Sequence, residues 1–308
     1  MKKIFIDGRN GTTGLRIDER LAGVKDIEIL TLPEELRKDP QAKKEIVNKA
    51  DIVFLCLPDD AAKETVSLIE NPNVCVIDTS TAHRTNPDWA YGFPELDISF
   101  YEKIKNSKRI AVPGCHASGF IALIYPLIKY GFISSDTSLS CTSLTGYSGG
   151  GKNMIADYNS SERNHLLDFP RAYGLSQSHK HLKEMVAICG LKDAPAFIPI
   201  VDNFYSGMEV LVPIFKKDLL KGNIEEIKDL YKQIYNSEII KYSDENENGF
   251  LSAGNKEGKD TMVISVFGNE DRILLCSRYD NLGKGASGAA IECLNIVLGN
   301  DKATSLIL

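Results

Sequence analysis

The first 115 residues alternate short apolar runs with amphipathic stretches. The apolar runs are rich in β-branched residues, are mostly bounded by turn-forming residues, and cover residues 3–8, 27–32, 51–58, 73–79 and 109–114. Helical patterns stand between them, over 14–23 and 59–70, and Asp59 and Asp60 are suited to cap the second of these. The alternation predicts a parallel, doubly wound sheet, covered on both faces because its strands are wholly apolar.

The pattern changes after residue 115. Residues 119–131 predict a buried helix that Pro126 ends or kinks. Longer strand candidates follow at 138–146, 196–202, 207–215, 262–268 and 272–280, with a helical pattern at 223–238. Strands grouped in this way predict a mixed or antiparallel sheet of α+β character. We therefore expect an α/β protein of two domains, 1–115 and 116–283, with a closing helix at 284–300 that packs back onto the first.

Composition and charge narrow the class of protein. The 308 residues are 43% hydrophobic and 25% charged, which is ordinary for a globular chain with ample core. The net charge of −6 argues against nucleic-acid binding. No apolar stretch reaches the length of a membrane span, and no signal peptide is evident, so we expect a cytoplasmic protein. Seven scattered cysteines without CxxC spacing predict no metal site and mostly buried thiols.

The end of the first strand carries a glycine-rich turn, DGRNGTTG. Its spacing is G-x-x-G-x-x-G, a variant of the dinucleotide-binding fingerprint, and a helix follows. Glycines there allow a tight turn and let backbone N–H groups approach a pyrophosphate. Glycine suits many strand-to-helix turns, but the position at the first βα junction favours a cofactor site. Its candidate residues are Gly8, Gly11, Thr12, Thr13 and Gly14.

The end of the second strand bears on the choice of cofactor. Thr31 stands where an NAD site commonly has an acidic residue, and Glu34 and Glu35 come late. Arg37 and Lys38 follow. A hydroxyl near basic groups suits a 2′-phosphate, so we expect NADP. The alternative interpretation is that the two basic residues only solvate a surface loop.

The stretch AVPGCHASGF places Cys115 at the expected start of a helix. The helix dipole and the unbonded N–H groups there favour a thiolate and can hold an oxyanion. Gly114 lets a carbonyl approach closely, and Ser118 is placed to cap the helix or donate to a substrate. Together with a dinucleotide site, this predicts thioester chemistry followed by hydride transfer. The alternative is a structural cysteine in a glycine-rich turn.

The chain has five histidines from which a base could come. His116 is adjacent to the thiol in sequence, so we expect its side chain to point elsewhere. In SHKHLKEM, Ser178 is expected to cap a helix with His179 in its first turn. Residues two apart on a helix diverge by about 200°, so we expect only one of His179 and His181 to reach the thiol. The alternative is a pair of exposed surface histidines.

Several motifs together resemble one enzyme family. They are GRNGTTG, DTSTAHR, YGFPEL, VPGCHASG, RAYG followed by HKHLKEM, and DNLGKGASGAAIECLN, and they span residues 8 to about 295. This set resembles the shorter form of the N-acetyl-γ-glutamyl-phosphate reductases of arginine biosynthesis. That family is related in fold and chemistry to aspartate-semialdehyde dehydrogenase. Longer members usually carry tyrosine where this chain has His116.

The resemblance implies a fold and a mechanism. A Rossmann-type NADP-binding domain would precede a substrate and dimerisation domain, and we expect a homo-oligomer, either a dimer or a tetramer. Cys115 would displace phosphate from an acyl phosphate, and NADPH would reduce the resulting thioester to the semialdehyde. His179 best matches the family's basic histidine, with His181 in support. Asn281 resembles the residue near the nicotinamide carboxamide.

A substrate with a carboxylate and an acyl phosphate needs cationic and hydroxyl ligands. Ser80 and Arg84 follow the fourth strand, and Arg171 is our choice for the carboxylate. These arginines could instead form structural ion pairs. By resemblance, Lys152 in the glycine-rich loop could meet the phosphate. That loop lacks the final Ser or Thr of a nucleoside-triphosphate motif, where Asn153 stands.

Other functions remain open at this point. A sister enzyme would act on aspartyl phosphate or on a carrier-bound aminoadipyl phosphate. A non-catalytic NADP-binding regulator would need only the glycine loop. A thiol redox switch would need a resolving cysteine near Cys115, for which Cys141 is the candidate.

Overall fold

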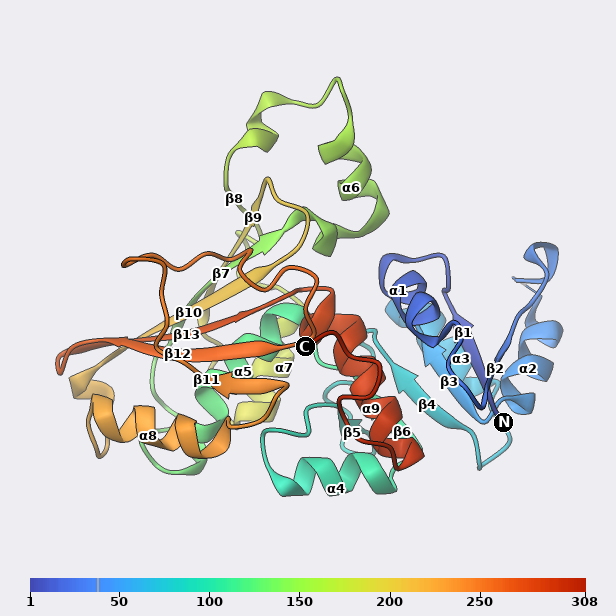
Figure 1. Ribbon diagram of the computed structural model, residues 1–308, viewed down its shortest axis with the longest axis horizontal. Helices are drawn as coiled ribbons and strands as arrows, with labels where there is room; N and C mark the ends of the chain where they lie inside the picture. The colour runs from blue at the N-terminus through green and yellow to red at the C-terminus, as the bar shows by residue number, and fades with distance from the viewer. Residues whose placement is uncertain (38) are drawn as a thin grey trace. The chain divides into compact units, whose positions relative to one another are not determined.

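The computed structural model describes residues 1–37 and 39–308, which fold into two compact units (Figure 1). Unit 1 comprises residues 1–113 and 286–305, and unit 2 comprises residues 114–285 and 306–308. Each unit has its own sheet. Lys38, which the sequence places beside the cofactor turn, lies outside the described residues.

The sheet of unit 1 is parallel throughout, in the order β2-β1-β3-β4-β6-β5. Its strands are β1 (Lys2–Asp7), β2 (Ile27–Leu30), β3 (Ile52–Leu55), β4 (Cys75–Asp78), β5 (Ala90–Tyr91) and β6 (Arg109–Ala111). Every residue of β3 and β4 is buried, as the continuous apolar runs predicted. The predicted doubly wound sheet is confirmed, and the two-residue strand β5 is an addition to it.

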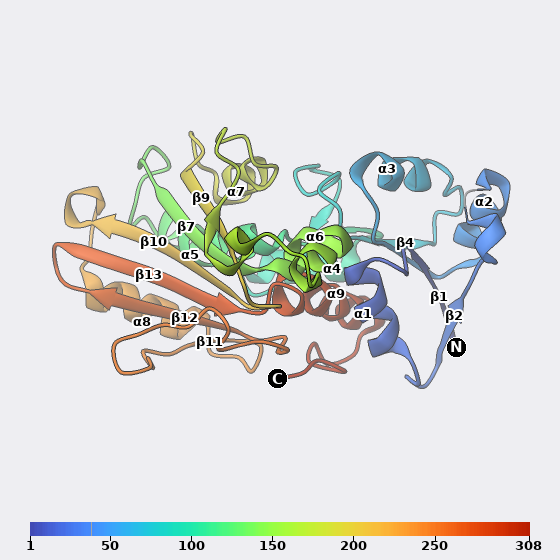
Figure 2. The same cartoon turned by 90° about the horizontal axis from the view of Figure 1, so that it is seen from above.

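Five helices cover this sheet: α1 (Thr12–Leu21), α2 (Pro40–Lys49), α3 (Asp59–Ser67), α4 (Ile98–Asn106) and α9 (Gly288–Leu298). Figure 2 shows α2 and α3 on one face, and α1 and α9 on the other. The helix α9 packs against α1 and α4. Asp59 does not cap α3, contrary to the sequence prediction, because its carboxylate accepts from the Thr81 backbone N–H instead, at 2.9 Å.

The sheet of unit 2 is mixed, in the order β11-β12-β13-β10-β7-β9-β8. Its strands are β7 (Ser140–Gly146), β8 (Arg171–Ala172), β9 (Ala196–Asp202), β10 (Met208–Phe215), β11 (Ile240–Tyr242), β12 (Met262–Gly268) and β13 (Arg272–Tyr279). The pairs β7–β9 and β11–β12 are parallel, and the other pairs are antiparallel. The predicted mixed sheet is therefore confirmed.

The helices of unit 2 are α5 (Cys115–Lys129), α6 (Gly151–Asn159), α7 (His181–Cys189) and α8 (Ile224–Ile234). The helix α5 packs on β10 and β13, and α7 and α8 pack against α5. Single-turn elements lie at Glu34–Leu36, Tyr147–Gly150, His165–Asp168, Lys216–Asp218 and, as a π turn before α9, Gly283–Ser287.

Pro126 does not end α5, which continues to Lys129. A proline has no N–H to give to the carbonyl four residues earlier, which here belongs to Ala122. That carbonyl accepts a hydrogen bond from the Tyr235 hydroxyl at 2.7 Å, just after α8. The neighbouring carbonyl of Leu123 accepts one from Tyr231 on α8. The tertiary packing thus supplies the bond that the proline removes.

Candidate active site

Cys115 is the first residue of α5, after Gly114 as the N-cap. Its side chain is partly exposed and is not in a disulfide. No side chain caps the helix, so the backbone N–H groups of the first turn and the positive end of the dipole lie beside the thiol. The Gly114 N–H donates to Oε1 of the buried Glu184 at 2.8 Å, which anchors the turn before the thiol.

A buried tyrosine locks the first turn of α5. The Tyr279 hydroxyl donates to the Cys115 carbonyl at 2.5 Å and accepts from the Gly119 N–H at 3.0 Å. It therefore bridges the two backbone groups that an α-helix joins directly. Glycine is needed at 119, since a Cβ there would lie 2.5 Å from Ser277 Oγ and 2.6 Å from the Tyr279 hydroxyl. The backbone that carries the thiol is thus held by the sheet beneath it.

Both candidate histidines lie in one cluster, and the predicted place of His179 in a helical first turn is wrong. The helix α7 begins at His181, so His179 precedes it and the 200° divergence does not apply. Ser178 does not cap this helix, because its hydroxyl lies 2.7 Å from that of Ser176. The rings of His179 and His181 are 4.7 Å apart, and each is 5.7 Å from the ring of His116, between centroids.

His116 is a member of the site that the sequence reasoning did not assign. Its Nδ1 lies 2.6 Å from Ser143 Oγ and its Nε2 lies 2.6 Å from the Tyr173 hydroxyl. Burial lowers the pKa of His116 to about 3, and the charge of His179 acts in the same direction. The ring is therefore neutral near pH 7. The only sequence signal for this role was its place beside the nucleophile.

Tyr173 belongs to the histidine cluster through its bond to His116. Burial raises the pKa of its phenol, and a negative charge on Cys115 acts in the same direction. The Tyr173 N–H donates to the Pro199 carbonyl at 3.0 Å, which fixes the tyrosine beside β9. A phenol that keeps its proton next to a thiolate is a hydrogen-bond donor to that site.

His179 is half-buried, and burial lowers its pKa below the usual value, with the charge of Lys180 adding to the effect. Its Nδ1 accepts from the His181 backbone N–H at 3.2 Å. A neutral imidazole that accepts at Nδ1 carries its proton on Nε2. His179 therefore presents a donor at Nε2 in its neutral state.

The glycine-rich turn in unit 1 is tightly folded. Gly8 has a φ of +88°, and a Cβ there would lie 2.2 Å from the main-chain oxygen of Cys56, just after β3. A Cβ on Gly14 would lie 2.4 Å from the Gly8 carbonyl, so both positions require glycine. Gly11 is the N-cap of α1, and no side chain caps the helix that Thr12 and Thr13 begin. Its first N–H groups fit a pyrophosphate.

A cavity of about 160 Å³ lies at the ends of β1 and β2. Its walls include Gly8, Thr31, Glu34 and Arg37. Thr31 is exposed, and Arg37 Nη1 lies 2.5 Å from Glu34 Oε1. The cavity thus combines a hydroxyl, a guanidinium and a carboxylate at the position where the sequence reasoning placed the 2′ end of the cofactor.

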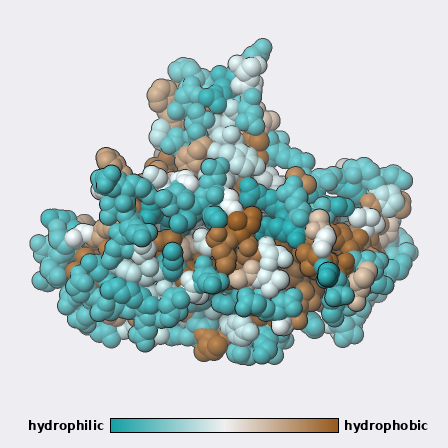
Figure 3. Space-filling view, in the orientation of Figure 1, coloured by the Kyte–Doolittle hydropathy of each residue, from teal (hydrophilic) through white to brown (hydrophobic). Residues whose placement is uncertain are grey.

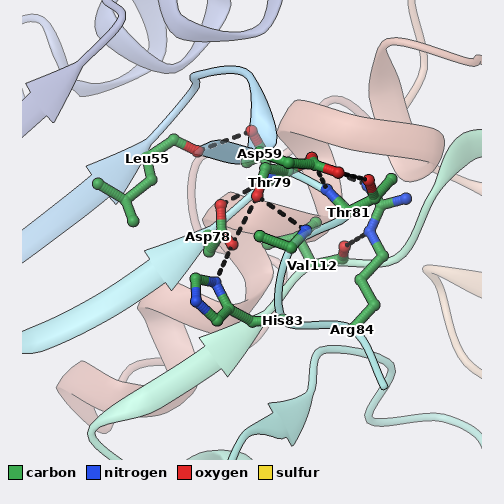
Figure 4. Close-up of polar contacts among 10 residues, drawn as sticks. Leu55, Asp59, Asp78, Thr79, Thr81, His83, Arg84 and Val112 are labelled. Carbon is green, nitrogen blue, oxygen red and sulfur yellow. Dashed lines mark hydrogen bonds and ion pairs between the residues drawn. The ribbon is translucent and has the colours of Figure 1, made fainter. Parts of the chain in front are cut away.

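The loop after β4 uses its polar groups internally (Figure 4). The Asp78 carboxylate accepts from the Ser80 N–H and hydroxyl, both at 2.8 Å, and lies 2.6 Å from His83 Nδ1. Arg84 donates from Nε to the Val112 carbonyl at 2.8 Å. Ser80 and Arg84 are only 7% and 8% exposed. Both candidate substrate ligands thus hold the fold of unit 1.

Asn281 lies in unit 2 and holds the glycine-rich loop there. Its Oδ1 accepts from the Gly207 N–H at 2.9 Å, and its Nδ2 donates to Ser148 Oγ at 3.0 Å. Only 1% of the residue is exposed. A contact to a nicotinamide carboxamide would use the second N–H of this amide or the second lone pair of Oδ1. Lys152, in the first turn of α6, is exposed.

Two further candidates remain, Ser118 and Arg171. The Ser118 hydroxyl donates to the Gly114 carbonyl at 3.0 Å and is buried, so it ties the helix start rather than facing outward. Arg171 is exposed on the edge strand β8, two residues before Tyr173. Of the predicted residues, the structure brings the two histidines together around His116, which directly follows Cys115 in the sequence.

Three further features bear on other functions: groups of metal ligands, the thiol of Cys141 and long apolar helices. Residues 1–37 and 39–308 contain no group of three or more His, Cys, Asp or Glu side chains arranged to hold a metal ion. Burial raises the pKa of the Cys141 thiol, which makes it a poor resolving partner for a redox switch. No helix among the described residues is both long and apolar enough to span a membrane.

Comparison with protein families accounts for both units. Residues 6–107 match the semialdehyde dehydrogenase NAD-binding domain, and residues 115–281 match the semialdehyde dehydrogenase dimerisation domain. The fold is shared with solved structures. Aspartate semialdehyde dehydrogenase II from Vibrio cholerae has a TM-score of 0.72 at 15% identity, over 97% of this chain and 98% of that one. The enzyme from Francisella tularensis also scores 0.72, at 16% identity, over 97% and 100%.

The fold and the thiol at the start of α5 thus define an oxidoreductase of the semialdehyde dehydrogenase class. Relatives named N-acetyl-γ-glutamyl-phosphate reductase are 45% identical in Chelativorans sp. (96% of this chain, 98% of the relative) and 42% identical in Rhizobium etli (97% and 99%). One from Nostoc sp., reductase 2, is 41% identical (96% and 97%). The chain belongs to the N-acetyl-γ-glutamyl-phosphate reductase family.

Proposed function

We propose that the protein reduces N-acetyl-γ-glutamyl phosphate to N-acetylglutamate semialdehyde and phosphate, with NADPH, in arginine biosynthesis. One observation carries the chemistry: Cys115 opens α5, and the next residue, His116, forms a cluster with Tyr173, His179 and His181. The names of relatives above 40% identity supply the substrate.

The first step forms a thioester. The thiolate sulfur of Cys115 attacks the acyl carbon, and the bond from that carbon to the phosphate oxygen breaks. The first-turn N–H groups of α5 stabilise the oxyanion that develops on the acyl oxygen. Tyr279 keeps those N–H groups in place by holding the Cys115 carbonyl and the Gly119 N–H. His179 donates from Nε2 to the oxygen that gains charge. The backbone N–H of His181 supports this role by donating to Nδ1 of the same ring.

In the second step, NADPH bound in unit 1 would supply the hydride that reduces the thioester. The chain's own residues then stabilise the charge of the thiolate that is released. The start of α5 provides N–H groups and the positive dipole end, and the Tyr173 phenol provides a hydrogen bond. The groups that stabilise the Cys115 thiolate before its attack therefore also stabilise it when it is released.

The residues of the unit 1 turn fit a dinucleotide. The pyrophosphate would lie on the uncapped N–H groups of α1, next to Gly8 and Gly11. Thr31 and Arg37 would hold the 2′-phosphate that distinguishes NADP from NAD. Glu34 pairs with Arg37 and would have to release it for this contact, so the strength of the preference for NADP depends on that ion pair.

The substrate anions need cations at the site. We assign the carboxylate to Arg171 and the phosphate to Lys152, both exposed and both in unit 2. We leave Ser80 and Arg84 out of the substrate set, because their side chains bind within unit 1.

We further propose a homo-oligomer, a dimer or a tetramer, built on the sheet of unit 2. The helices α5, α7 and α8 cover one face of that sheet. Apolar side chains on the other face are exposed, among them Ile198 at 43% and Phe215 at 48%. All seven cysteines are outside disulfides, which fits the reducing cytoplasm.

The reverse reaction tests the proposed function. NADP reduction would be followed with N-acetylglutamate semialdehyde and phosphate, using the wild type and Cys115→Ala, with aspartate semialdehyde as the comparison substrate. We expect phosphate-dependent turnover of the acetylated substrate alone, and loss of it in the variant. Turnover of aspartate semialdehyde instead would move the assignment to the sister enzyme. Binding of NADP without turnover of either substrate would favour the non-catalytic regulator.

A further inference from the structure

Unit 2 contains a second, larger cavity, of about 740 Å³. It lies where the end of α8, the edge strand β11 and residues 256–261 meet. Figure 3 shows mostly hydrophilic residues over α8 and β11, in the orientation of Figure 1. Four lysines line the cavity: Lys232, Lys241, Lys256 and Lys259.

Two of these lysines have protein partners. Lys232 Nζ lies 3.0 Å from Asp229 Oδ1, and Lys259 Nζ donates to the Leu308 main-chain oxygen at 2.6 Å. Lys241 and Lys256 form no ion pair with any carboxylate in the described part of the chain. Two lysines without an ion-pair partner in that part of the chain therefore line one cavity.

The positive charges lie close together. Lys256 is partly buried, and burial lowers its pKa, with the charges of Lys241, Arg278 and Lys259 adding to the effect and Glu245 opposing it. Like charges held in a cavity with few acids create a positive potential that attracts anions. This local charge contrasts with the net charge of −6 for the whole chain.

The remaining wall of the cavity suits a polar ligand. Thr261 and Ser237 contribute hydroxyls and Asn236 an amide, while Glu238 is the one carboxylate among its lining residues. Tyr242, also in the wall, is bonded to Asp244. Donors thus outnumber acidic acceptors.

We propose that this cavity binds a small anion with two or more negative charges, such as a phosphoanion or a polycarboxylate, through Lys241, Lys256 and Lys259. The site stands apart from the thiol, because β11 is one edge of the sheet, whereas Tyr173 follows β8 at the opposite edge. The inference does not depend on the proposed function.

Site-resolved labelling of amines tests the proposal directly. The full chain would be treated briefly with an amine-reactive reagent, with or without pyrophosphate or citrate, and each lysine would be quantified by peptide mass spectrometry. We expect at least about threefold protection of Lys241 and Lys256 by one of these probes, and none by potassium chloride of equal ionic strength. The probe that gives the stronger protection shows whether the cavity prefers phosphoanions or polycarboxylates.

Titration calorimetry of lysine variants shows which side chains contribute to anion binding. Lys241→Gln/Lys256→Gln should weaken binding of the protecting probe by at least about tenfold, because two charge-assisted contacts are lost. The matched control is Lys217→Gln/Lys221→Gln, which removes two lysines of unit 2 that lie over aromatic rings instead, and which should bind as the wild type does.

Three results would overturn the proposal. One is equal protection of all lysines. Another is unchanged affinity in Lys241→Gln/Lys256→Gln, which would place the anion elsewhere, such as on the cofactor turn. The last is resistance of Lys241 and Lys256 to labelling without any probe, which would mean that a second copy of the chain covers the cavity.

Discussion

His116 Nε2 lies 2.6 Å from the Tyr173 hydroxyl, and His116 Nδ1 lies 2.6 Å from Ser143 Oγ. The buried imidazole is neutral, so it has one proton for its two neighbours. When that proton is on Nε2, the ring donates to Tyr173 and leaves the phenolic O–H to donate toward Cys115. When it is on Nδ1, Tyr173 donates to the ring instead. The tautomer of His116 thus sets the direction of the Tyr173 proton.

Tyr173→Phe should therefore lower kcat about tenfold to a hundredfold, because one hydrogen bond to a charged group is worth about 1.5–3 kcal/mol. The substrate KM should change much less, since the phenol acts on the thiolate and its acyl adduct. Steady-state kinetics in the forward direction measure both constants. An unchanged kcat with a raised KM would show that the phenol binds substrate instead.

Acid should destabilise the fold through His116. Its pKa is about 3 in the folded chain and about 6.5 when unfolded, so the unfolded chain binds the extra proton at intermediate pH. Stability should then fall as the pH drops below about 6.5, by about 1.4 kcal/mol per pH unit from this residue. Urea unfolding at several pH values measures the slope. In His116→Gln the slope should be shallower, and an identical slope would contradict the account.

The pH dependence of activity should reflect His179. Because its pKa is lowered, the neutral ring predominates at pH 7. Protonation of Nδ1 would break the bond from the His181 N–H that orients the ring, so kcat/KM should fall only as the pH drops through a value below 6.5. The charge of Lys180 contributes to this shift, so Lys180→Gln should move the acid limb toward higher pH. His179→Asn should lower kcat by about a hundredfold or more and abolish the limb. A limb that persists in His179→Asn would assign it to another group.

Gly119→Ala should damage both stability and activity. The added methyl group would meet Ser277 Oγ and the Tyr279 hydroxyl inside 3 Å, in a packed core that cannot relax easily. We expect a loss of about 2–3 kcal/mol in unfolding free energy and a fall in kcat at temperatures where the variant is folded. Gly23→Ala is the matched control for stability alone, since nothing lies within 4 Å of a Cβ there. Its φ of +79° gives a purely local strain.

Much of the architecture could be predicted from local pattern. The strand candidates at 196–202 and 262–268 coincide with β9 and β12, because alternating or continuous apolar residues report burial directly. Pro126 does not end α5, because the carbonyl that it leaves without a backbone partner accepts from a distant hydroxyl, that of Tyr235. A rule that considers only residues close to the proline in the sequence cannot include such a partner.

The site was predicted less completely than the fold. Cys115 could be found because its chemistry depends on a local feature, the helix start. The cluster around His116 could not, because Ser143 reaches it from β7 and Tyr173 from the segment after β8. The predicted place of His179 in a helical first turn is wrong, because α7 begins only at His181, and a shift of this size changes the direction in which a side chain points.

The most direct test of the central claim is the mass of the intact protein after mixing with N-acetyl-γ-glutamyl phosphate in the absence of NADPH. The account predicts one acyl adduct per chain, located on Cys115 by peptide mapping, removed by NADPH or by phosphate, and absent in Cys115→Ala. An enzyme that turns over its substrate but never carries this adduct, or that carries it on another residue, would contradict the thioester mechanism.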